Sequence, residues 1–145
     1  MLKLIMTKVV SIVFFLCLLS GSLSAQDRGI KLWVSGADTY PTTLAYDIMD
    51  ASGNRITADF VPLQDAKTPV VIPVALTDKF GVVIYEDANE NGELDMGIFG
   101  QPTERYGFSN GAWKFLGRPE HSETLVAPKG NWTELRMTLK SVMDY

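Results

Sequence analysis

The chain has 145 residues, of which 46% are hydrophobic and 21% are charged, and its formal net charge at pH 7 is −4. An acidic chain without a cluster of Lys and Arg residues is a poor candidate for binding nucleic acid or an anionic membrane surface. Its length suits one domain that buries a hydrophobic core.

Residues 1–25 show the order of segments that is typical of a secretory signal peptide. Lys3 and Lys8 supply a positively charged start, residues 9–19 form an apolar run, and small residues lead up to Ala25. The apolar run is shorter than the ~20 residues that span a membrane, so we expect cleavage near Ala25 rather than an uncleaved anchor. The protein would then be periplasmic or secreted, with no membrane span after cleavage.

Cleavage would leave residues 26–145 as a single domain. The only cysteine, Cys17, is lost with the signal peptide, so no disulfide can stabilise this domain. Of the 13 Lys and Arg residues Lys3 and Lys8 are lost as well, which leaves 11 against 17 Asp and Glu and a charge of −6. The stability of the domain must come from apolar packing, with a bound ion as a further contribution.

Short segments rich in apolar residues, most of them alternating apolar and polar residues, recur along the mature chain, and alternation is typical of strands with one buried face. The segments are 30–35, 44–49, 56–61, 70–76, 80–85, 123–127 and 134–140. Pro73 predicts an edge strand or a bulge for the fourth segment, and the β-branched and aromatic residues of the fifth predict a central strand. No segment has helical periodicity over three turns. The pattern predicts an all-β sandwich of about seven strands.

The alternating segments also predict which side chains form the core. The apolar residues that recur at every second position should face the interior of the sandwich. They are Leu32, Val34, Leu44, Tyr46, Ile48, Val82, Ile84, Leu135, Met137 and Leu139.

Oxygen-bearing side chains follow the fifth segment at alternate positions, starting at Asp87, and Gly92 comes where a tight loop needs a sharp turn. Ca²⁺ takes six to eight oxygen ligands, and the order D-x-[DN]-x-[DN]-G is the first half of an EF-hand loop. The sequence therefore predicts a Ca²⁺ site formed by Asp87, Asn89, Asn91, Glu93 through its backbone carbonyl, and Asp95.

The match to an EF-hand ends at the twelfth position, where Ile98 stands instead of a bidentate Glu. The missing oxygens would come from elsewhere, and Glu86 and Glu104 are the nearest candidates. Because two positions carry Asn rather than Asp, we expect weak affinity, suited to Ca²⁺ at about 0.1–1 mM. The alternative is that Asn91 and Gly92 form a type I′ hairpin turn without a ligand.

A second motif, G-x-S-x-G, runs from Gly107 through Ser109 to Gly111 and matches the nucleophile elbow of hydrolases. An elbow needs a hydrophobic strand before it and a helix after it, and the flanking residues predict neither. His121 is the only histidine, and its neighbour Glu120 is the only clear candidate to orient it. The motif thus indicates either a hydrolase or a turn of small residues with unusual backbone angles.

Residues 97–119 form a long aperiodic stretch rich in Gly, Pro and aromatic residues, and such loops are usually functional or mobile. Its aromatic residues would either present a binding platform or fold the loop back onto the edge of the sandwich. These aromatic residues are Tyr106, Phe108, Trp113 and Phe115. The residues that we expect to form the loop and a possible ligand site are Glu104, Tyr106, Phe108, Ser109 and Asn110.

The two motifs together resemble the DUF2141 family of bacterial exported proteins of unknown function. The resemblance rests on D-x-N-x-N-G-x-L-D from Asp87, followed by F-G-x-P-x-E-x-Y-G-F-S-N from Phe99 to Asn110. It covers residues 30–141 and is strongest over residues 82–110. It implies an immunoglobulin-like or transthyretin-like β-sandwich and names no activity. Members often carry His before the first Asp, where this chain has Glu86.

These observations favour an exported, Ca²⁺-binding β-sandwich that acts as a binding or cell-envelope interaction module for an unknown cell-envelope or extracellular ligand. No convincing catalytic constellation is present, so we do not expect an enzyme; the alternative is a secreted hydrolase that uses Ser109. A third hypothesis is an assembly module that pairs through an exposed edge strand.

Overall fold

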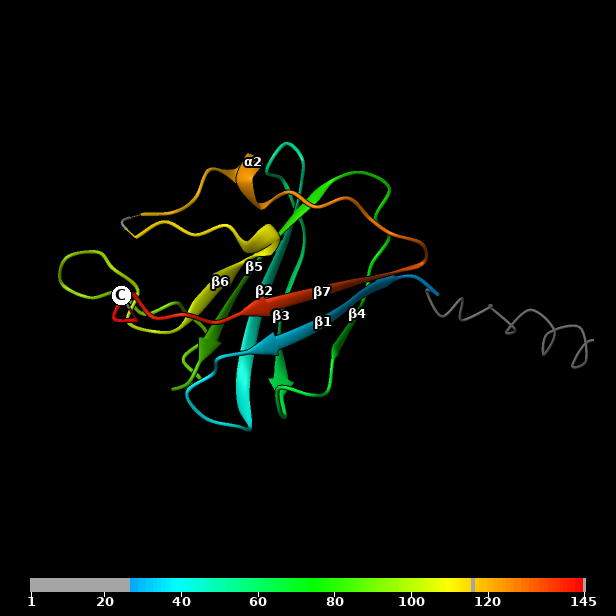
Figure 1. Cartoon of the computed structure of the whole chain (residues 1–145). Helices are drawn as coiled ribbons and strands as arrows, with labels where there is room; N and C mark the ends of the chain where they lie inside the picture. The colour runs from blue at the N-terminus through cyan, green and yellow to red at the C-terminus, as the bar shows by residue number, and fades with distance from the viewer. Residues whose placement is uncertain (1–26, 116, 145) are drawn as a thin grey trace, which may run out of the picture.

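The computed structural model describes residues 27–115 and 117–144, so the predicted signal peptide lies outside the described residues. Within the described residues, seven strands form two sheets (Figure 1). The strands are β1 (Gly29–Ser35), β2 (Thr42–Asp50), β3 (Arg55–Leu63), β4 (Val70–Pro73), β5 (Phe80–Asp87), β6 (Tyr106–Phe108) and β7 (Trp132–Thr138). A short 3₁₀ helix, η1 (Ser109–Gly111), and a short helix, α2 (His121–Thr124), complete the described elements.

The two sheets pack face to face as a sandwich, which confirms the predicted all-β architecture. One sheet has the strand order β4-β1-β7, and the other has the order β3-β2-β5-β6. The pairing of β1 with β7 is parallel, whereas the other strand pairs are antiparallel. In Figure 1, β1 and β7 cross in front of β2 and β3, so the strands of the two sheets run in different directions.

The core lies between the sheets and consists of the inward-facing residues of the alternating strands. Of the predicted core residues, nine are buried, and Leu135 is only partly buried and packs against the core cluster. The buried core cluster contains Ile30, Leu32, Val34, Leu44, Tyr46, Ile48, Leu63, Ile72, Val74, Phe80, Val82, Ile84, Met137 and Leu139.

The positions of β4 and β5 agree with their sequences. Among the described strands β4 pairs only with β1, so it is an edge strand, and Pro73 at its end needs no inward N–H. The strand β5 lies between β2 and β6, and its inward residues Val82 and Ile84 are fully buried. Both predictions from the sequence are therefore confirmed.

Two segments differ from the sequence prediction. The strand expected at residues 123–127 is wrong, because α2 occupies its first half and only Val126 bridges to Phe80. The helix forms because Glu120 and Glu123 make reciprocal side-chain to backbone hydrogen bonds at its start, a capping box. The segment Tyr106–Phe108 is a strand although its sequence is aperiodic, because β5 offers an unpaired edge.

The strand β6 also closes one side of the sandwich. Tyr106 exchanges two backbone hydrogen bonds with Lys140, which follows β7 in the other sheet, at 3.0 and 2.9 Å. A Cβ atom at Gly107 would lie 2.7 Å from the carbonyl oxygen of Thr138, so this close approach of two backbones requires glycine. Among the described helices, none is long and apolar enough to cross a membrane.

Candidate functional site

Two adjacent carboxylates mark the point where β5 leaves the sandwich. Glu86 and Asp87 are both buried but lie on opposite faces of the strand, because neighbouring side chains of a strand alternate. Glu86 continues the inner face of Val82 and Ile84, and its Oε2 accepts a hydrogen bond from the N–H of Asp38 at 2.9 Å. Its Oε1 has no hydrogen-bond partner in the described structure. Glu86 therefore points away from the loop that follows and does not supply it with an oxygen.

Asp87 begins the segment Asp87–Asp95, which we call the acidic loop, and holds its turn together. One carboxylate oxygen accepts the N–H of Asn91 at 3.1 Å, and the other accepts the N–H of Gly92 at 2.9 Å. Glu90 and Gly92 have positive φ angles of 57° and 78°, whereas Asn91 does not. A type I′ turn needs positive φ at both central residues, so Asn91 and Gly92 do not form one.

Asp95 closes the acidic loop from its other end. The Asn89 and Asn91 side-chain amides donate hydrogen bonds to its two oxygens at 2.6 and 2.8 Å. Glu104, from outside the loop, accepts the N–H groups of Ala88 at 3.2 Å and Asp95 at 3.1 Å. The structure thus brings Glu104 to the loop, as the sequence suggested, and excludes Glu86 from it.

The acidic loop concentrates negative charge. Burial raises the pKa of Glu104, and the nearby Asp95 and Asp87 charges raise it further, against two backbone hydrogen bonds that lower it. Within the described residues, no group of three or more His, Cys, Asp or Glu side chains has the arrangement of a metal site. The oxygens available to a cation here are those of Asp87, Asp95 and Glu104 together with the Asn amides.

A pocket of about 540 Å³ lies beside the acidic loop, on the outer face of the sheet that contains β5 and β6. The side chains that form it are mostly apolar or aromatic and come from β5, β6, the acidic loop and the segment after it, the segment before α2, and the segment after β7. We call it the apolar pocket; it is lined by Val83, Tyr85, Leu94, Met96, Phe99, Gly100, Gln101, Pro102, Tyr106, Phe108, Phe115, Gly117, Arg118 and Val142. Its volume is within the range of sites that bind small molecules.

The acidic loop and the apolar pocket share structure at two places. Leu94 and Met96 line the pocket on either side of Asp95, whose own side chain is bound within the acidic loop. Tyr85 lines the pocket, and its pKa is raised by burial first and then by the charges of Asp87, Glu104 and Glu93. The acidic loop therefore supplies part of one wall of the pocket through Leu94.

Aromatic contacts fix the floor of the apolar pocket. The rings of Tyr106 and Trp113 stack with centroids 4.8 Å apart, and Tyr106 meets Phe108 edge to face at 5.8 Å. The Arg118 guanidinium lies over the Phe108 ring, 5.8 Å from its centroid. Tyr106, Phe108 and Trp113 thus pack against one another at the sheet edge, which agrees with one of the two alternatives from the sequence, and Tyr106, Phe108 and Phe115 line the pocket.

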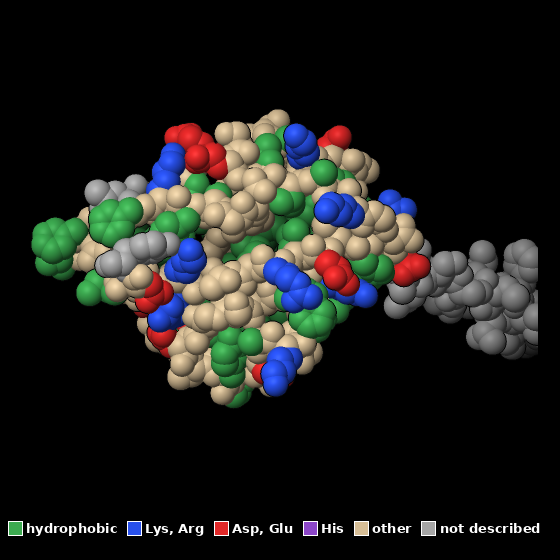
Figure 2. Space-filling model, in the orientation of Figure 1, with side chains coloured by type: hydrophobic (Ala, Val, Ile, Leu, Met, Phe, Trp, Pro, Cys, Tyr) green, Lys and Arg blue, Asp and Glu red, His purple; other side chains and the backbone are tan. Residues whose placement is uncertain are grey.

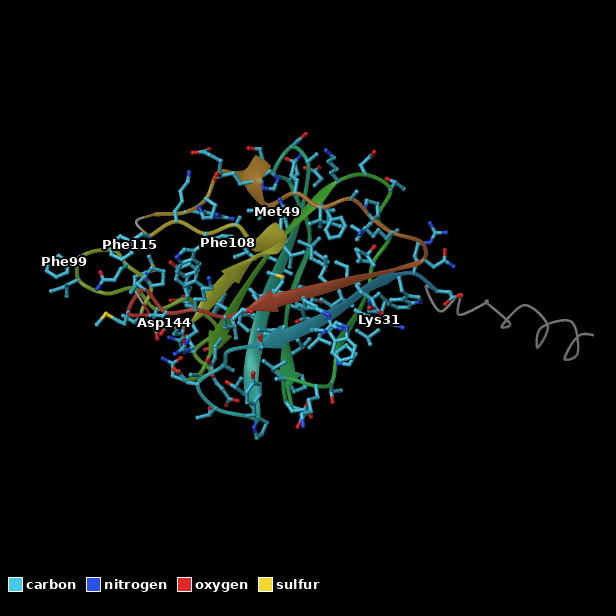
Figure 3. The ribbon with its side chains drawn as sticks, in the orientation of Figure 1. Lys31, Met49, Phe99, Phe108, Phe115 and Asp144 are labelled. Carbon is cyan, nitrogen blue, oxygen red and sulfur yellow. The ribbon has the colours of Figure 1, made fainter. Side chains whose placement is uncertain are left out.

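The mouth of the pocket carries exposed apolar side chains. Ile98 and Phe99 are 92% and 87% exposed at the tip of the loop that follows the acidic loop. Figure 2 shows hydrophobic side chains gathered at this end of the molecule, with basic and acidic side chains next to them toward its middle. In Figure 3, Phe99 projects farthest, Phe115 lies on a neighbouring loop, and Phe108 lies on β6 at the edge of the sandwich. Two neighbouring large apolar side chains with this much exposure are typical of a binding surface.

Ser109 has a structural position. Its buried hydroxyl accepts the N–H of Val82 at 2.8 Å and donates to the carbonyl of Thr124 at 2.5 Å, so it links β5 to α2. The imidazole of His121 contacts the carbonyl oxygen of Asp50 at 2.7 Å. A nucleophile needs an accessible oxygen beside a general base. The Ser109 hydroxyl is buried, and it contacts backbone groups rather than the His121 ring.

The predicted ligand-site residues therefore separate into three groups. Tyr106 and Phe108 line the apolar pocket, and Glu104 hydrogen-bonds to the acidic loop from outside it. Ser109 and Asn110 hydrogen-bond to backbone carbonyls of α2. Asn110 has a positive φ of 61° and donates to the carbonyl of Glu123 at 2.9 Å.

Sequence reasoning missed most of the apolar pocket. The residues it did not select include Leu94, Met96, Phe99 and Arg118. A signal was present, because three bulky apolar residues within six positions of an acidic loop are unusual for a segment exposed to water.

Comparison with known proteins identifies a bacterial family. The sequence profile described as "Uncharacterized protein conserved in bacteria (DUF2141)" matches residues 38–135, well over half of the chain. The chain belongs to this family, as its two motifs indicated. No curated protein and no solved structure matches it.

Proposed function

We propose that this protein is an exported binding module that holds an apolar ligand in the apolar pocket. The observation that carries the proposal is a hollow of about 540 Å³ lined mainly by apolar and aromatic side chains. Such a surface costs free energy when it is wet, and a ligand that fills it removes apolar area from water at about 25 cal/mol per Å². Few polar groups converge there, which favours binding over chemical transformation.

The second part of the proposal is that the acidic loop binds Ca²⁺ and thereby fixes one wall of the pocket. The ligands would be Asp87, Asn89, Asn91, Asp95 and the backbone carbonyl of Glu93, with Glu104 as an additional oxygen. In support, an Asn amide presents either its N–H₂ or its oxygen after a 180° turn, so the groups that now donate to Asp95 can also coordinate a cation. Calorimetric titration of the purified protein with Ca²⁺ tests this part, and the absence of binding at millimolar Ca²⁺ refutes it.

The proposal includes export to the periplasm or the medium, which rests on residues 1–25. Mass spectrometry of the protein recovered outside the cytoplasm should give an N-terminus near Gln26. Recovery of the intact Met1 terminus would contradict this part.

For the fold, we propose the transthyretin-like rather than the immunoglobulin-like type of sandwich. An immunoglobulin constant-type domain places its first, second, fourth and fifth strands in one sheet. Here the first strand shares a sheet with the fourth and seventh, which favours the other type.

The two competing functions have less support. The contacts of Ser109 offer no accessible nucleophile, so we do not propose the hydrolase. An assembly module would need an unprotected edge strand, and β3 is a long exposed edge of its sheet. It carries Pro62 near its end and charges at Arg55 and Asp59, which are features that discourage strand pairing.

A filled-pocket variant tests the proposed function. Val83 is half-buried on the pocket floor, and Val83→Trp places a large ring in the space that a ligand would occupy. We expect the uncharged dye Nile red to bind the wild-type protein with increased fluorescence and to lose about tenfold or more in affinity in Val83→Trp. Val71→Trp is the matched control, because Val71 is 53% exposed on β4 in the other sheet. Equal dye binding by all three proteins, each shown to be folded by circular dichroism, would refute the proposal.

A further inference from the structure

The apolar pocket has a chemical polarity along its length. At the Tyr85 end the pocket meets the acidic loop, because Tyr85 lies two residues before Asp87 on the same face of β5, and Leu94, which lines the pocket, lies between Glu93 and Asp95. At the other end, Phe108 pairs with Val83 across the strands, and Arg118 lies over its ring. One end of the pocket is therefore negative and the other end carries a cation.

Arg118 has no counter-ion in the described structure. It is the one charged residue among the described residues that line the pocket, and no described carboxylate lies within ion-pair distance of it. Its neighbour Lys114 differs, because that ammonium group pairs with Glu123 at 3.3 Å and Glu120 at 3.7 Å. A guanidinium at the rim of an apolar pocket offers paired donors to a carboxylate or a similar anion.

We propose that the ligand is a single-chain amphiphile, with an alkyl chain in the apolar pocket and a carboxylate or similar anionic group held by Arg118. This inference rests on the proposed function and names its ligand class. The chain would lie over Val83 and Tyr85, and the anion would sit at the Phe108 end, away from the acidic loop. The reverse orientation would bring the anion toward Asp87 and Glu104, where like charges repel it.

The exposed mouth of the pocket fits an elongated apolar ligand. Phe99 lines the pocket although 87% of its surface is exposed, so a chain that enters beside it would cover a ring that now faces water. A free amphiphile suits the molecule better than a lipid in an anionic bilayer, because the chain is acidic overall and the acidic loop adjoins the pocket.

Three alkyl probes of equal length that differ in head-group charge test this inference. Titration calorimetry in Ca²⁺-free buffer would compare dodecanoate, dodecanol and dodecyltrimethylammonium, each below its micelle concentration. We expect dodecanoate to bind the wild-type protein about tenfold more tightly than dodecanol, the scale of one charge-assisted contact. The cationic probe should bind no more tightly than dodecanol.

Variants of Arg118 assign the head-group contact. Arg118→Gln should lower dodecanoate affinity about tenfold and leave dodecanol affinity unchanged, and Arg118→Lys should retain part of the difference. Lys114→Gln removes the same charge from the same segment outside the pocket and should change neither. Equal dodecanoate binding by wild type and Arg118→Gln would overturn the inference while leaving the pocket in place.

Two further outcomes separate the possible failures. If neither dodecanol nor Nile red binds the wild-type protein, the proposed function itself fails. If the protein sediments with phosphatidylglycerol vesicles and binds no free dodecanoate, the ligand source is a membrane lipid and the free amphiphile is refuted.

Discussion

The two faces of β5 show how one strand can serve both the fold and a site. On the inner face, Val82 and Ile84 are fully buried against the opposite sheet. On the outer face, Val83 and Tyr85 are only half-buried and form part of the floor of the apolar pocket. The same kind of side chain stabilises the sandwich on one face and remains available to a ligand on the other.

The two carboxylates at the end of β5 also differ between the inner and the outer face of the strand. Glu86 on the inner face has one oxygen without a hydrogen-bond partner among the described groups, whereas Asp87 on the outer face has both oxygens bound by backbone N–H groups. Asp87 thus organises the acidic loop from a rigid strand end. Under the proposed function, the outer face of β5 and the loops beyond it would hold the ligand, while the inner face contributes to the stability of the core.

The largest expected effect is on the free energy of unfolding, when a valine on the inner face of β5 is replaced by alanine. The same substitution on the outer face is the comparison. Val82→Ala should lower the free energy of unfolding by about 2–3 kcal/mol, because it leaves a cavity in the packed core. Val83→Ala should cost about 1 kcal/mol or less, because Val83 is only half-buried and lies outside the core. Urea denaturation of both variants measures the difference, and equal costs would contradict the assignment of the two faces.

A smaller effect is expected for the hydroxyl that holds β5 to α2. Ser109→Ala leaves the N–H of Val82 without its acceptor in a buried place, at a cost of about 1–3 kcal/mol. The control is Ser35→Ala, because the Ser35 hydroxyl contacts the Thr138 hydroxyl at the surface. This variant should lose less than about 0.5 kcal/mol of unfolding free energy. Nile red binding by Ser109→Ala should remain, whereas lost binding in a folded variant would place Ser109 in the site.

The acidic loop should respond to Ca²⁺ through Asp87 and Asp95. At Ca²⁺ of ten times the dissociation constant, binding to the native state alone adds about 1.4 kcal/mol to stability, which raises the melting temperature by a few degrees. Asp87→Ala combined with Asp95→Ala should abolish this increment, and Ser109→Ala should keep it.

A charge-matched control separates coordination from general electrostatics. Asp78→Ala combined with Glu134→Ala removes two acidic charges away from the loop and should retain the Ca²⁺ increment. An unchanged wild-type melting temperature and unchanged loop proteolysis in millimolar Ca²⁺ would mean that the acidic loop is only a solvated turn.

The smallest effect is a pH dependence that arises from Glu104. Its pKa lies above the ordinary value of 4.5, chiefly because of burial, so in metal-free buffer the folded state binds more protons than the unfolded state just above pH 4.5. The free energy of unfolding contributed by this group therefore falls as pH rises through that window. Glu104→Gln should remove this fall, and denaturation curves of both proteins from pH 4 to 7 measure it. A wild-type slope that persists in the variant would contradict the assignment.

The sequence predicted the sandwich well because its core follows local rules. Period-two spacing identified Val82 and Ile84 as inner residues, and Pro73 correctly indicated an edge strand. The sequence prediction was wrong at residues 123–127, because a single-turn helix capped by Glu120 and Glu123 is too short to show a periodic pattern.

The candidate site was predictable only in part for a related reason. The acidic loop is one continuous motif, so its members from Asp87 to Asp95 could be read directly. The apolar pocket is formed by segments that are far apart in the chain. Only the fold places Arg118 over Phe108 and brings Leu94 to the same pocket. Glu86 was misjudged because its position next to Asp87 in sequence places it on the opposite face.

Chemical-shift mapping by NMR can show whether the outer face of β5 is the floor of a ligand site. The purified, isotope-labelled protein would be titrated with dodecanol below its micelle concentration. We expect shifts that saturate at Val83, Leu94, Met96 and Phe108, with little change at Val71 on the other sheet. Saturable shifts confined to β3 or β4, or no saturable shifts at all, would contradict this expectation.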